Sequence, residues 1–543
     1  MTVLFPTTRR DFLRVTSTAA LVAGLPGWHH ARLGSLAALH PHVDPAAGPN
    51  DPLLRALALQ AVDAARTAGA VYADVRFTSD RTQTIAPQQT YGSVTEEGTV
   101  SVAVRALVAG GWGFATAPDC TEDSVVRLAR QATAQAAIPR WPTETPIQLD
   151  DHPPTQTGTW TTPMVRDPFQ VSVDEKVDWL QNCLGAPERV GLHDVSLSTQ
   201  LVFRRQEKVF ASTTGAYVTQ TLVWVGPSDL SVQVTDPATQ AQQAVTIPLV
   251  PLQSGGYEWL ATVQLDDRVE GWVDEAWRQA RKIPVPIGRV PLVLDAYTTA
   301  ALVRSTVGYA TEWDRVRGDD VNAAGTSYLS AATLGQAVAA PTVTVTGSRS
   351  QPRGPALVGW DDDGVASSSF PLVDRGVLVD FATSRADATQ LRTWYTSRRQ
   401  AVRSHGCAVA DTAADRPLVM PPDLTLTPGT GTAGFADLVA GVGTGVAVVR
   451  GECDLDREQR AGQGTGTMYE IRNGRLGRVL NPGATFLFRS AEVWHHLLSV
   501  GGAASTVLRG FRSSKGEPEQ TASHGVWAVP IALRDIVLID ADR

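Results

Sequence analysis

The 543-residue chain has few cysteines and no block of basic residues in its mature part. Its four cysteines lie far apart and form no C-x-x-C pair, which argues against a zinc ribbon or a dithiol redox motif; they are Cys120, Cys183, Cys407 and Cys453. Lysine and arginine number 47 against 55 aspartates and glutamates, a formal net charge of −8. Because nucleic-acid binding needs a positive surface, we expect no DNA or RNA partner.

A long apolar run is also missing near the N-terminus, where residues 15–25 are only mildly apolar. A membrane-spanning helix needs about 20 such residues, so we expect no stable membrane span. This stretch follows Thr8-Arg9-Arg10-Asp11-Phe12-Leu13-Arg14, a pattern typical of a twin-arginine export signal. The alternative is a short amphipathic helix that carries two arginines. We expect residues 1–50 to be signal and linker, and the chain to be exported to the periplasm or the extracellular space.

The rest of the chain has ordinary globular composition, with 43% hydrophobic and 19% charged residues. Its length exceeds a typical domain of about 100–150 residues several times, so we expect two or three domains. Helical and alternating patterns predict an N-terminal α+β domain over 52–140 and, after a proline-rich linker, a middle α+β domain over 155–283 that ends in a long helix over 257–281. A β-rich C-terminal domain over 286–543 begins with a strand and a helix over 298–316. The predicted fold class is α+β.

Several motifs resemble the TldD/PmbA metallopeptidase family and occur in the same order as in that family. The N-terminal ones are Glu96-Glu97-Gly98, Val104-Arg105-Ala106-Leu107-Val108 and Gly111-Trp112-Gly113-Phe114. The C-terminal ones are Asp361-Asp362-Asp363-Gly364-Val365, Arg375-Gly376-Val377-Leu378, Pro417-Leu418-Val419-Met420, Leu426-Thr427-Pro428-Gly429 and Tyr469-Glu470-Ile471-Arg472-Asn473-Gly474. The resemblance runs from about residue 52 to the C-terminus and is weakest in the middle. It implies a TldD/PmbA-like α+β fold.

The resemblance also implies a zinc site. In the family, an H-E-x-x-x-H helix supplies two histidines and a glutamate base, and a later cysteine completes the metal site. Here Arg304 and Tyr309 stand at the histidine positions, Ser305 at the glutamate, and Ser513 or Ser514 at the cysteine. Because arginine cannot be deprotonated to bind a metal, the sequence predicts that the chain holds no zinc or other cofactor.

The remaining candidate residues are weaker. Arg304 is predicted either to fill the vacant site with its charge, paired with Glu312 or Asp314, or to be a solvent-facing helix residue. His405 and His524 lie in loops that resemble the family, and for His524 a turn-forming role is the alternative. No G-x-S-x-G elbow and no phosphate-binding loop occurs.

Three functions remain open on these grounds. The first is an inactive, metal-free subunit that pairs as a homodimer, or as a heterodimer with another TldD/PmbA-family chain, and contacts a peptide substrate. The second is an active peptidase that uses His405, His524, Glu312 or Asp314 as non-standard ligands. The third is an exported peptide- or ligand-binding protein whose cleft uses tryptophans, with Trp313, Trp360 and Trp394 as candidates.

Overall fold

The computed structural model describes residues 15–18, 51–87, 92–139, 145–150, 157–226, 228–263 and 265–542. The predicted export signal, with Arg9 and Arg10, lies outside these residues except for β1 (Val15–Thr18), which pairs with β3. Among the described residues, no helix is both long enough and apolar enough to cross a membrane. All four cysteines are buried and unpaired.

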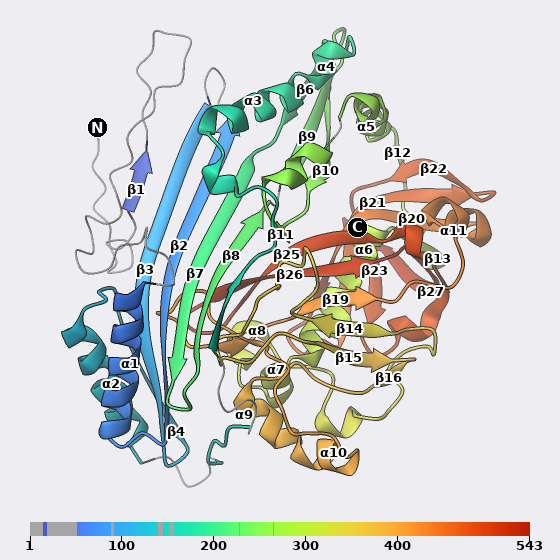
Figure 1. The fold of residues 1–543 in the computed structure, drawn as a ribbon. Coiled ribbons are helices and arrows are strands. Elements are labelled where there is room, and N and C mark those ends of the chain that lie inside the picture. Colours follow the sequence, from blue (N-terminus) through green and yellow to red (C-terminus); the bar gives the residue numbers. More distant parts are fainter. Residues whose placement is uncertain are drawn as a thin grey trace.

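One long eight-stranded sheet joins the N-terminal and middle regions (Figure 1). Its order is β1-β3-β2-β7-β8-β11, with β4 beside β3 and β5 beside β8. The strands are β2 (Tyr72–Pro87), β3 (Gly92–Val108), β4 (Gly111–Ala117), β5 (Thr157–Thr161), β7 (Leu201–Ser212), β8 (Tyr217–Val225) and β11 (Gln253–Ser254). Strands β2 and β7 pair antiparallel from Asp74 opposite Ser212 to Ile85 opposite Leu201, so the two regions share one backbone ladder.

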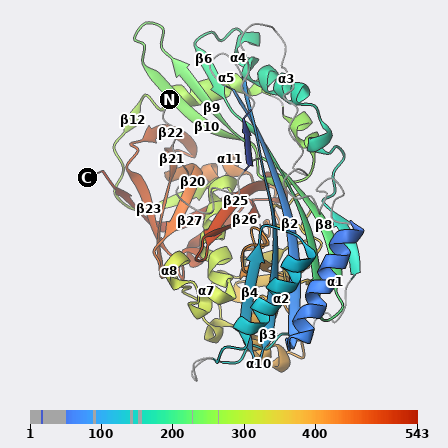
Figure 2. The same ribbon diagram turned by 90° about the vertical axis from the view of Figure 1, so that its left-hand side faces the viewer.

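Helices α1 (Pro52–Thr67) and α2 (Glu122–Ala136) cover the outer face of this sheet (Figure 2). The buried side chains of α1 recur at helical spacing and pack with those of α2, β2 and β3 in one apolar core. Helix α2 begins at Thr121, whose hydroxyl accepts a hydrogen bond from the Ser124 amide.

The middle region adds a three-stranded sheet, β10-β9-β6, made of β6 (Val195–Ser198), β9 (Ser228–Thr235) and β10 (Gln242–Val250). It packs with α3 (Val173–Leu184), α4 (Ala186–Arg189) and α5 (Asp266–Arg278). The prediction of one helix over 257–281 was wrong, because a short 3-10 helix (Tyr257–Thr262) precedes α5. The Leu260 carbonyl accepts hydrogen bonds from the Val263 amide and from the Trp179 indole, which ends the first helix.

The C-terminal domain is β-rich, as predicted, and consists mainly of two sheets. The eight-stranded sheet contains β12 (Lys282–Ile283), β13 (Gly288–Leu294), β20 (Gly445–Leu455), β21 (Ala461–Arg472), β22 (Arg475–Leu480), β23 (Ala484–Arg489), β24 (Leu497–Val500) and β27 (Ile531–Asp540). The six-stranded sheet contains β14 (Val345–Ser348), β15 (Ser369–Asp374), β16 (Val377–Leu378), β19 (Asp423–Leu426), β25 (Val507–Lys515) and β26 (Gln520–Ala528). Helix α6 (Ala296–Val303) contacts β20 of one sheet and β25 and β26 of the other, so it lies between them.

Buried ion pairs join the C-terminal domain to the long sheet. Arg105 on β3 contacts Asp363 at 2.6 Å, and Lys208 on β7 contacts Asp362 at 2.9 Å. Gly364 follows Asp363 and has φ +76. A Cβ atom at this position would lie 2.5 Å from the Phe210 ring. The Asp-Asp-Asp-Gly motif therefore fastens the two parts together, and only glycine fits at its turn.

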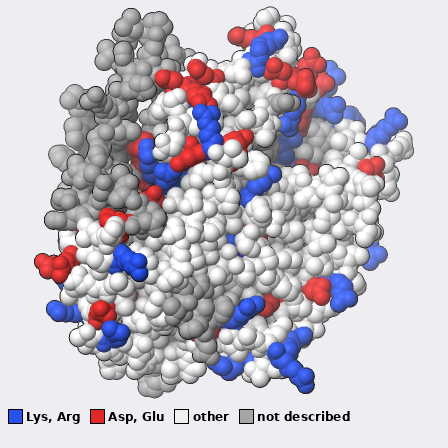
Figure 3. Space-filling view, viewed as in Figure 1, with Lys and Arg blue, Asp and Glu red and all other residues white. Residues whose placement is uncertain are grey.

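On the face in Figure 3, charged side chains of both signs are scattered, and much of the centre is uncharged. No large basic patch occurs among the described residues of that face, in line with the net charge of −8.

Candidate functional site

The segment at the family's zinc motif leaves the α-helical path. Helix α6 ends at Val303, and residues Arg304–Gly308 form one π-helical turn in which the Tyr309 amide donates to the Arg304 carbonyl. A hydrogen bond spanning five residues brings positions 304 and 309 to the same side of the helix. The chain therefore keeps the backbone turn that a five-residue ligand spacing requires.

The prediction of a single helix over 298–316 was wrong. After the π turn come a 3-10 turn (Tyr309–Thr311) and α7 (Trp313–Arg317). Between these two helical segments, Glu312 forms an isolated parallel β-bridge with Ala382. The Thr311 carbonyl accepts a hydrogen bond from the Ala382 amide, and the Trp313 amide donates one to the Ala382 carbonyl. These tertiary hydrogen bonds replace the helical ones.

Arg304 lies inside the motif site, with its side chain only 14% exposed. Its guanidinium carbon is 4.4 Å from the Phe511 ring centre and 5.6 Å from that of Tyr309. The predicted pairing with Glu312 or Asp314 was wrong, as was a solvent-facing position. Arg304 instead approaches Glu452 at 3.7 Å and donates weakly to the Cys453 carbonyl at 3.5 Å.

Serine replaces two of the family's functional side chains here, and both hydroxyls are bound inside the protein. Ser305 donates to the Cys453 carbonyl at 2.8 Å. Ser513 Oγ lies 2.8 Å from the Tyr309 hydroxyl and 3.4 Å from His524 Nδ1. Side chains alternate along β25, so Ser513 faces inward and Ser514 is exposed. Ser513 is therefore the residue that faces the motif helix.

Glu312 and Asp314 belong to a separate ion cluster centred on Lys515. The ammonium of Lys515 donates to Glu312 at 2.6 Å, to Asp314 at 2.7 Å and to the Val419 carbonyl. All three charged side chains are buried, and the two acids raise the pKa of Lys515 against the effect of burial. Sequence reasoning missed Lys515, although its two-residue spacing from Ser513 on a strand placed both on one face.

His405 lies in another part of the core. Its Nε2 is 2.8 Å from Asp380 Oδ2, and the Tyr395 hydroxyl donates to the other oxygen of that carboxylate. The imidazole also stacks on Phe370, with ring centres 4.0 Å apart. The structure thus brings His524 to Arg304, Tyr309 and Ser513, and gives His405 a different set of partners.

The residues at the motif site do not fit a zinc ion. His524 is the single imidazole among them, and the ring is fully buried with Nε2 unpartnered. Burial, and then the charges of Arg304 and Arg349, lower its pKa to about 3. A neutral imidazole can bind zinc, but the positive Arg304 at the same site repels a cation and offers it no lone pair. Among the described residues, no group of three or more His, Cys, Asp or Glu is placed to hold a metal ion.

The three candidate tryptophans differ in position. Trp313 is 5% exposed and packs on Phe381 in the core, while Trp394 is half-buried under Arg398. Trp360 lines a cavity between the long sheet and the C-terminal domain. Trp360 is therefore the one that this cavity places next to space for a ligand.

A cleft of about 1190 Å³ opens beside the Lys515 cluster. Trp112 and Gln135 line it from the N-terminal region, and Asp314, Arg317 and Leu418 from the C-terminal domain. Its size suits a peptide segment. Asp314 is the one predicted site residue that lines this cleft within the described chain.

Comparison with known protein families matches the chain to the family that its sequence motifs resemble. The family model described as PmbA/TldA metallopeptidase C-terminal domain matches residues 287–520, and that of PmbA/TldA metallopeptidase domain 1 matches residues 90–136. Together they cover just over half of the chain. These matches and the fold define an α+β protein of metallopeptidase architecture.

Relatives with assigned names are distant. A metalloprotease of Archaeoglobus fulgidus is 26% identical over 236 residues, which are 43% of this chain and 51% of that protein. A metalloprotease of Methanocaldococcus jannaschii is 22% identical over 335 residues, 61% of this chain and 70% of that protein. The chain thus spans about half the length of the first relative. The chain belongs to the TldD/PmbA family of metallopeptidase homologues.

Solved structures share the fold. A candidate modulator of a DNA gyrase from Thermotoga maritima superposes with a TM-score of 0.66 at 14% identity, covering 89% of this chain and all of that one. TldE from Thermococcus kodakarensis gives 0.65 at 13% identity, covering 89% and 99%. At such identities the likeness shows the fold alone.

Proposed function

We propose that this chain is an exported, catalytically inactive and metal-free subunit that forms a peptide-processing assembly with another TldD/PmbA-family chain. The observation that carries the proposal is the position of Arg304. Its guanidinium packs between the Tyr309 and Phe511 rings at the site where the family resemblance places a metal. A fixed positive charge there opposes both the metal and the water that the metal would activate.

The remaining motif positions support the same proposal. Ser305 and Ser513 hydrogen-bond to internal partners, and none of these hydrogen bonds joins a carboxylate. Glu312 and Asp314, the nearest acids in the sequence, are held in a buried cluster with the two cations Lys515 and Arg315. A peptidase that uses them as metal ligands would first have to break this buried cluster, at a cost of several kcal/mol.

The assembly role rests on the family resemblance and on the preserved architecture. The cleft beside Asp314 and Leu418 offers space for a peptide segment, and a TldE-like fold is kept over most of the chain. The twin-arginine pattern at Arg9 and Arg10 supports the proposal that the chain is exported after folding, with or without its partner.

Co-expression with a histidine-bearing family chain tests the proposal. We expect the two chains to co-purify, and peptide hydrolysis to require the histidine-bearing chain and to be lost on chelation. Replacing that chain's two motif histidines should abolish activity without dissociating the complex. A stable monomer over a wide concentration range, or chelator-sensitive hydrolysis by this chain alone, would contradict the proposal.

A further inference from the structure

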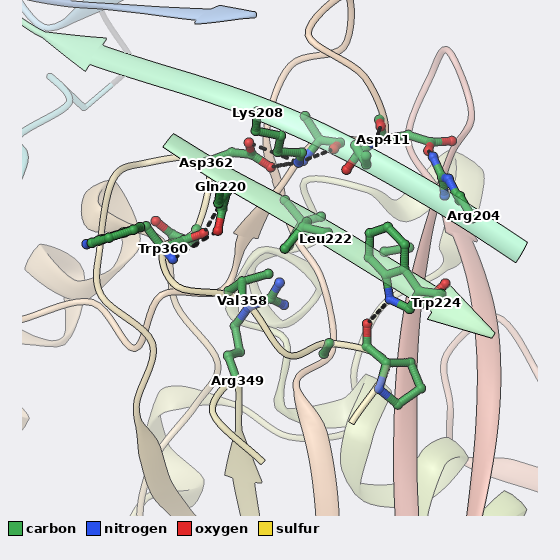
Figure 4. A pocket seen from close by; sticks show the side chains of 18 of the residues that line it. Arg204, Lys208, Gln220, Leu222, Trp224, Arg349, Val358, Trp360, Asp362 and Asp411 are labelled. Atoms are coloured by element: carbon green, nitrogen blue, oxygen red, sulfur yellow. Dashed lines mark hydrogen bonds and ion pairs between the residues drawn. The ribbon is translucent and has the colours of Figure 1, made fainter. Parts of the chain in front are cut away.

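A small polar cavity lies between the long sheet and the C-terminal domain, and the zinc-motif positions are not among its lining residues (Figure 4). Its volume is about 40 Å³. The sheet contributes alternate residues of two strands, which share one face; they are Arg204, Gln206 and Lys208 of β7 and Gln220, Leu222 and Trp224 of β8. The C-terminal domain contributes Arg349, directly after β14, and the loop around Asp361.

Two of the three cations that line this cavity are neutralised internally. Arg204 contacts Asp80 at 2.5 Å and Asp411 at 2.9 Å. Lys208 contacts Asp362 at 2.9 Å and donates to the Ala410 carbonyl.

Two polar uncharged side chains of the sheet that line the cavity are also occupied. Gln220 donates to the Trp360 carbonyl and accepts from the amides of Gly359 and Trp360. The Trp224 indole donates to the Pro355 carbonyl at 2.8 Å. These groups hold the walls of the cavity together and leave no strong donor free for a ligand.

Arg349 is the exception. It is 4% exposed, its Nε has no hydrogen-bond partner, and no carboxylate of the described chain forms an ion pair with it. In Figure 4 its side chain extends toward Leu222 on β8, and no dashed line joins it to another residue drawn. A buried unpaired arginine is costly, so its retention calls for a partner that the chain does not itself supply.

The nearest acids do not serve as that partner. Both oxygens of Asp361 accept backbone hydrogen bonds, from the amides of Asp363, Val365 and Ala408. Burial raises the pKa of Asp361, and it raises the pKa of Asp423 to about 7. The charge of Arg349 lowers the pKa of both acids, but neither forms an ion pair with it within the described chain. Asp423 Oδ1 accepts from the amides of Ala356 and Gly525, and its Oδ2 is unpartnered.

We propose that Arg349 binds the carboxylate group of a ligand in this cavity. The planar fork of a guanidinium donates two parallel hydrogen bonds to a carboxylate. A volume of about 40 Å³ leaves room for a small group such as a carboxylate. Apolar walls, such as Leu222 and Val358, suit the carbon that follows.

The cavity reaches solvent where its lining is only half-buried. The Arg204 and Asp411 side chains are 19% and 28% exposed, and Thr521 and Ser523 beside them are also partly exposed. A ligand can therefore insert its carboxylate and keep the remainder outside. That this remainder is a peptide rests on the proposed function, whereas the carboxylate itself is assigned from the contacts of Arg349.

Sodium acetate is the first probe, exchanged for sodium chloride at constant ionic strength. We expect acetate to raise the melting temperature of the full chain, because a ligand that binds only the folded state stabilises it. Arg349→Met should weaken acetate binding at least about tenfold, the loss expected for hydrogen bonds between charged groups. Arg353→Met, a half-buried arginine four residues along that binds Gln253, is the matched control and should respond as the wild type does.

Stability without acetate separates ligand binding from a structural role. Arg349→Met should leave the unfolding midpoint unchanged or raise it, because an unpaired buried charge is removed. A large loss of stability, an equal acetate response of Arg349→Met, or no response of the wild type would overturn the proposal.

Short peptides identify the source of the carboxylate. Binding of a peptide acid but not of its C-terminal amide would assign a peptide terminus, and binding of an amide that carries aspartate would assign an acidic side chain. Binding of acetate alone would keep the carboxylate site and count against a peptide ligand. Because none of these measurements depends on metal or hydrolysis, failure of the proposed function would not mimic failure of this site.

Discussion

Two arginines of the C-terminal domain, Arg304 and Arg349, differ in whether the chain supplies partners for their charge. Arg304 lies among aromatic rings with Glu452 and a carbonyl within reach, in a site whose hydroxyls are already bound to one another. Arg349 is more deeply buried and has no ion-pair partner among the described residues, but it faces a cavity. Arg304 has an acid and a carbonyl of the chain as partners, although its Nε and His524 Nε2 are unpartnered, whereas the guanidinium of Arg349 has no partner in the described chain. The family's metal position has therefore become packing, whereas a position outside the motif carries the sign of ligand binding.

Restoring the family's zinc ligands should produce the largest change at the motif site around Arg304. In the variant Arg304→His, Ser305→Glu, Tyr309→His and Ser513→Cys, we expect zinc binding to appear at one ion per chain, because the π turn already aligns positions 304 and 309. Metal analysis after dialysis measures it. The matched control places the cysteine at Ser514, which points away, and should bind zinc far more weakly. Equal zinc in both variants would refute the assignment of Ser513.

Removing the charge of Lys515 should cost more than removing any other single charge near the motif. Lys515→Met leaves Asp314 buried without its cation and Glu312 paired with Arg315 alone, and we expect a loss of about 3–5 kcal/mol in the free energy of unfolding. Urea denaturation measures it. Adding Glu312→Gln to the variant should recover part of the loss, and a double variant no more stable than Lys515→Met would argue against this cluster.

The pH dependence of stability tests the burial of His524. Its pKa is lowered to about 3 in the folded state, against about 6.5 unfolded, so the unfolded state binds more protons between these values. Its contribution is present above about pH 6.5 and is lost as pH falls toward 3, by up to about 1.4 kcal/mol per pH unit.

Asp423 acts in the opposite direction. Its pKa is raised to about 7 in the folded state, against about 3.9 in the unfolded state, so the folded state binds more protons between these values. The free energy of unfolding therefore falls as pH rises from about 3.9 to about 7. We therefore expect His524→Asn to reduce the slope of unfolding free energy against pH between 4 and 6, and Asp423→Asn to steepen it. Unchanged slopes in both variants would show that neither group is buried as described.

The two neighbouring serines give the smallest expected difference. Ser513→Ala removes the hydrogen bond to Tyr309 and should cost about 1 kcal/mol, while Ser514→Ala, on the exposed face, should change stability by less than about 0.5 kcal/mol. Thermal or urea unfolding of the two variants side by side decides it. Equal losses would mean that the alternation along β25 does not separate them.

Much of the fold follows from local patterns, since α1, α2 and the β-rich C-terminal domain form where periodicity and turn residues indicate them. The break after α6 could not be predicted, because it depends on hydrogen bonds to Ala382, some 70 residues away in sequence. The pairing of Lys515 with Glu312 and Asp314 has the same origin. The replacement of the motif residues could be predicted from the resemblance. Arg349 could not be singled out from the sequence, because only the tertiary structure shows that no carboxylate of the described chain pairs with it.

The most direct test is the metal content of the purified mature chain, measured by mass spectrometry after expression in zinc-supplemented medium and exhaustive dialysis. We expect far less than one zinc per chain, the same trace level in Arg304→Ala, and no chelator-sensitive peptide hydrolysis by the chain alone. One tightly held zinc per chain, lost when His524 is replaced, would contradict this expectation.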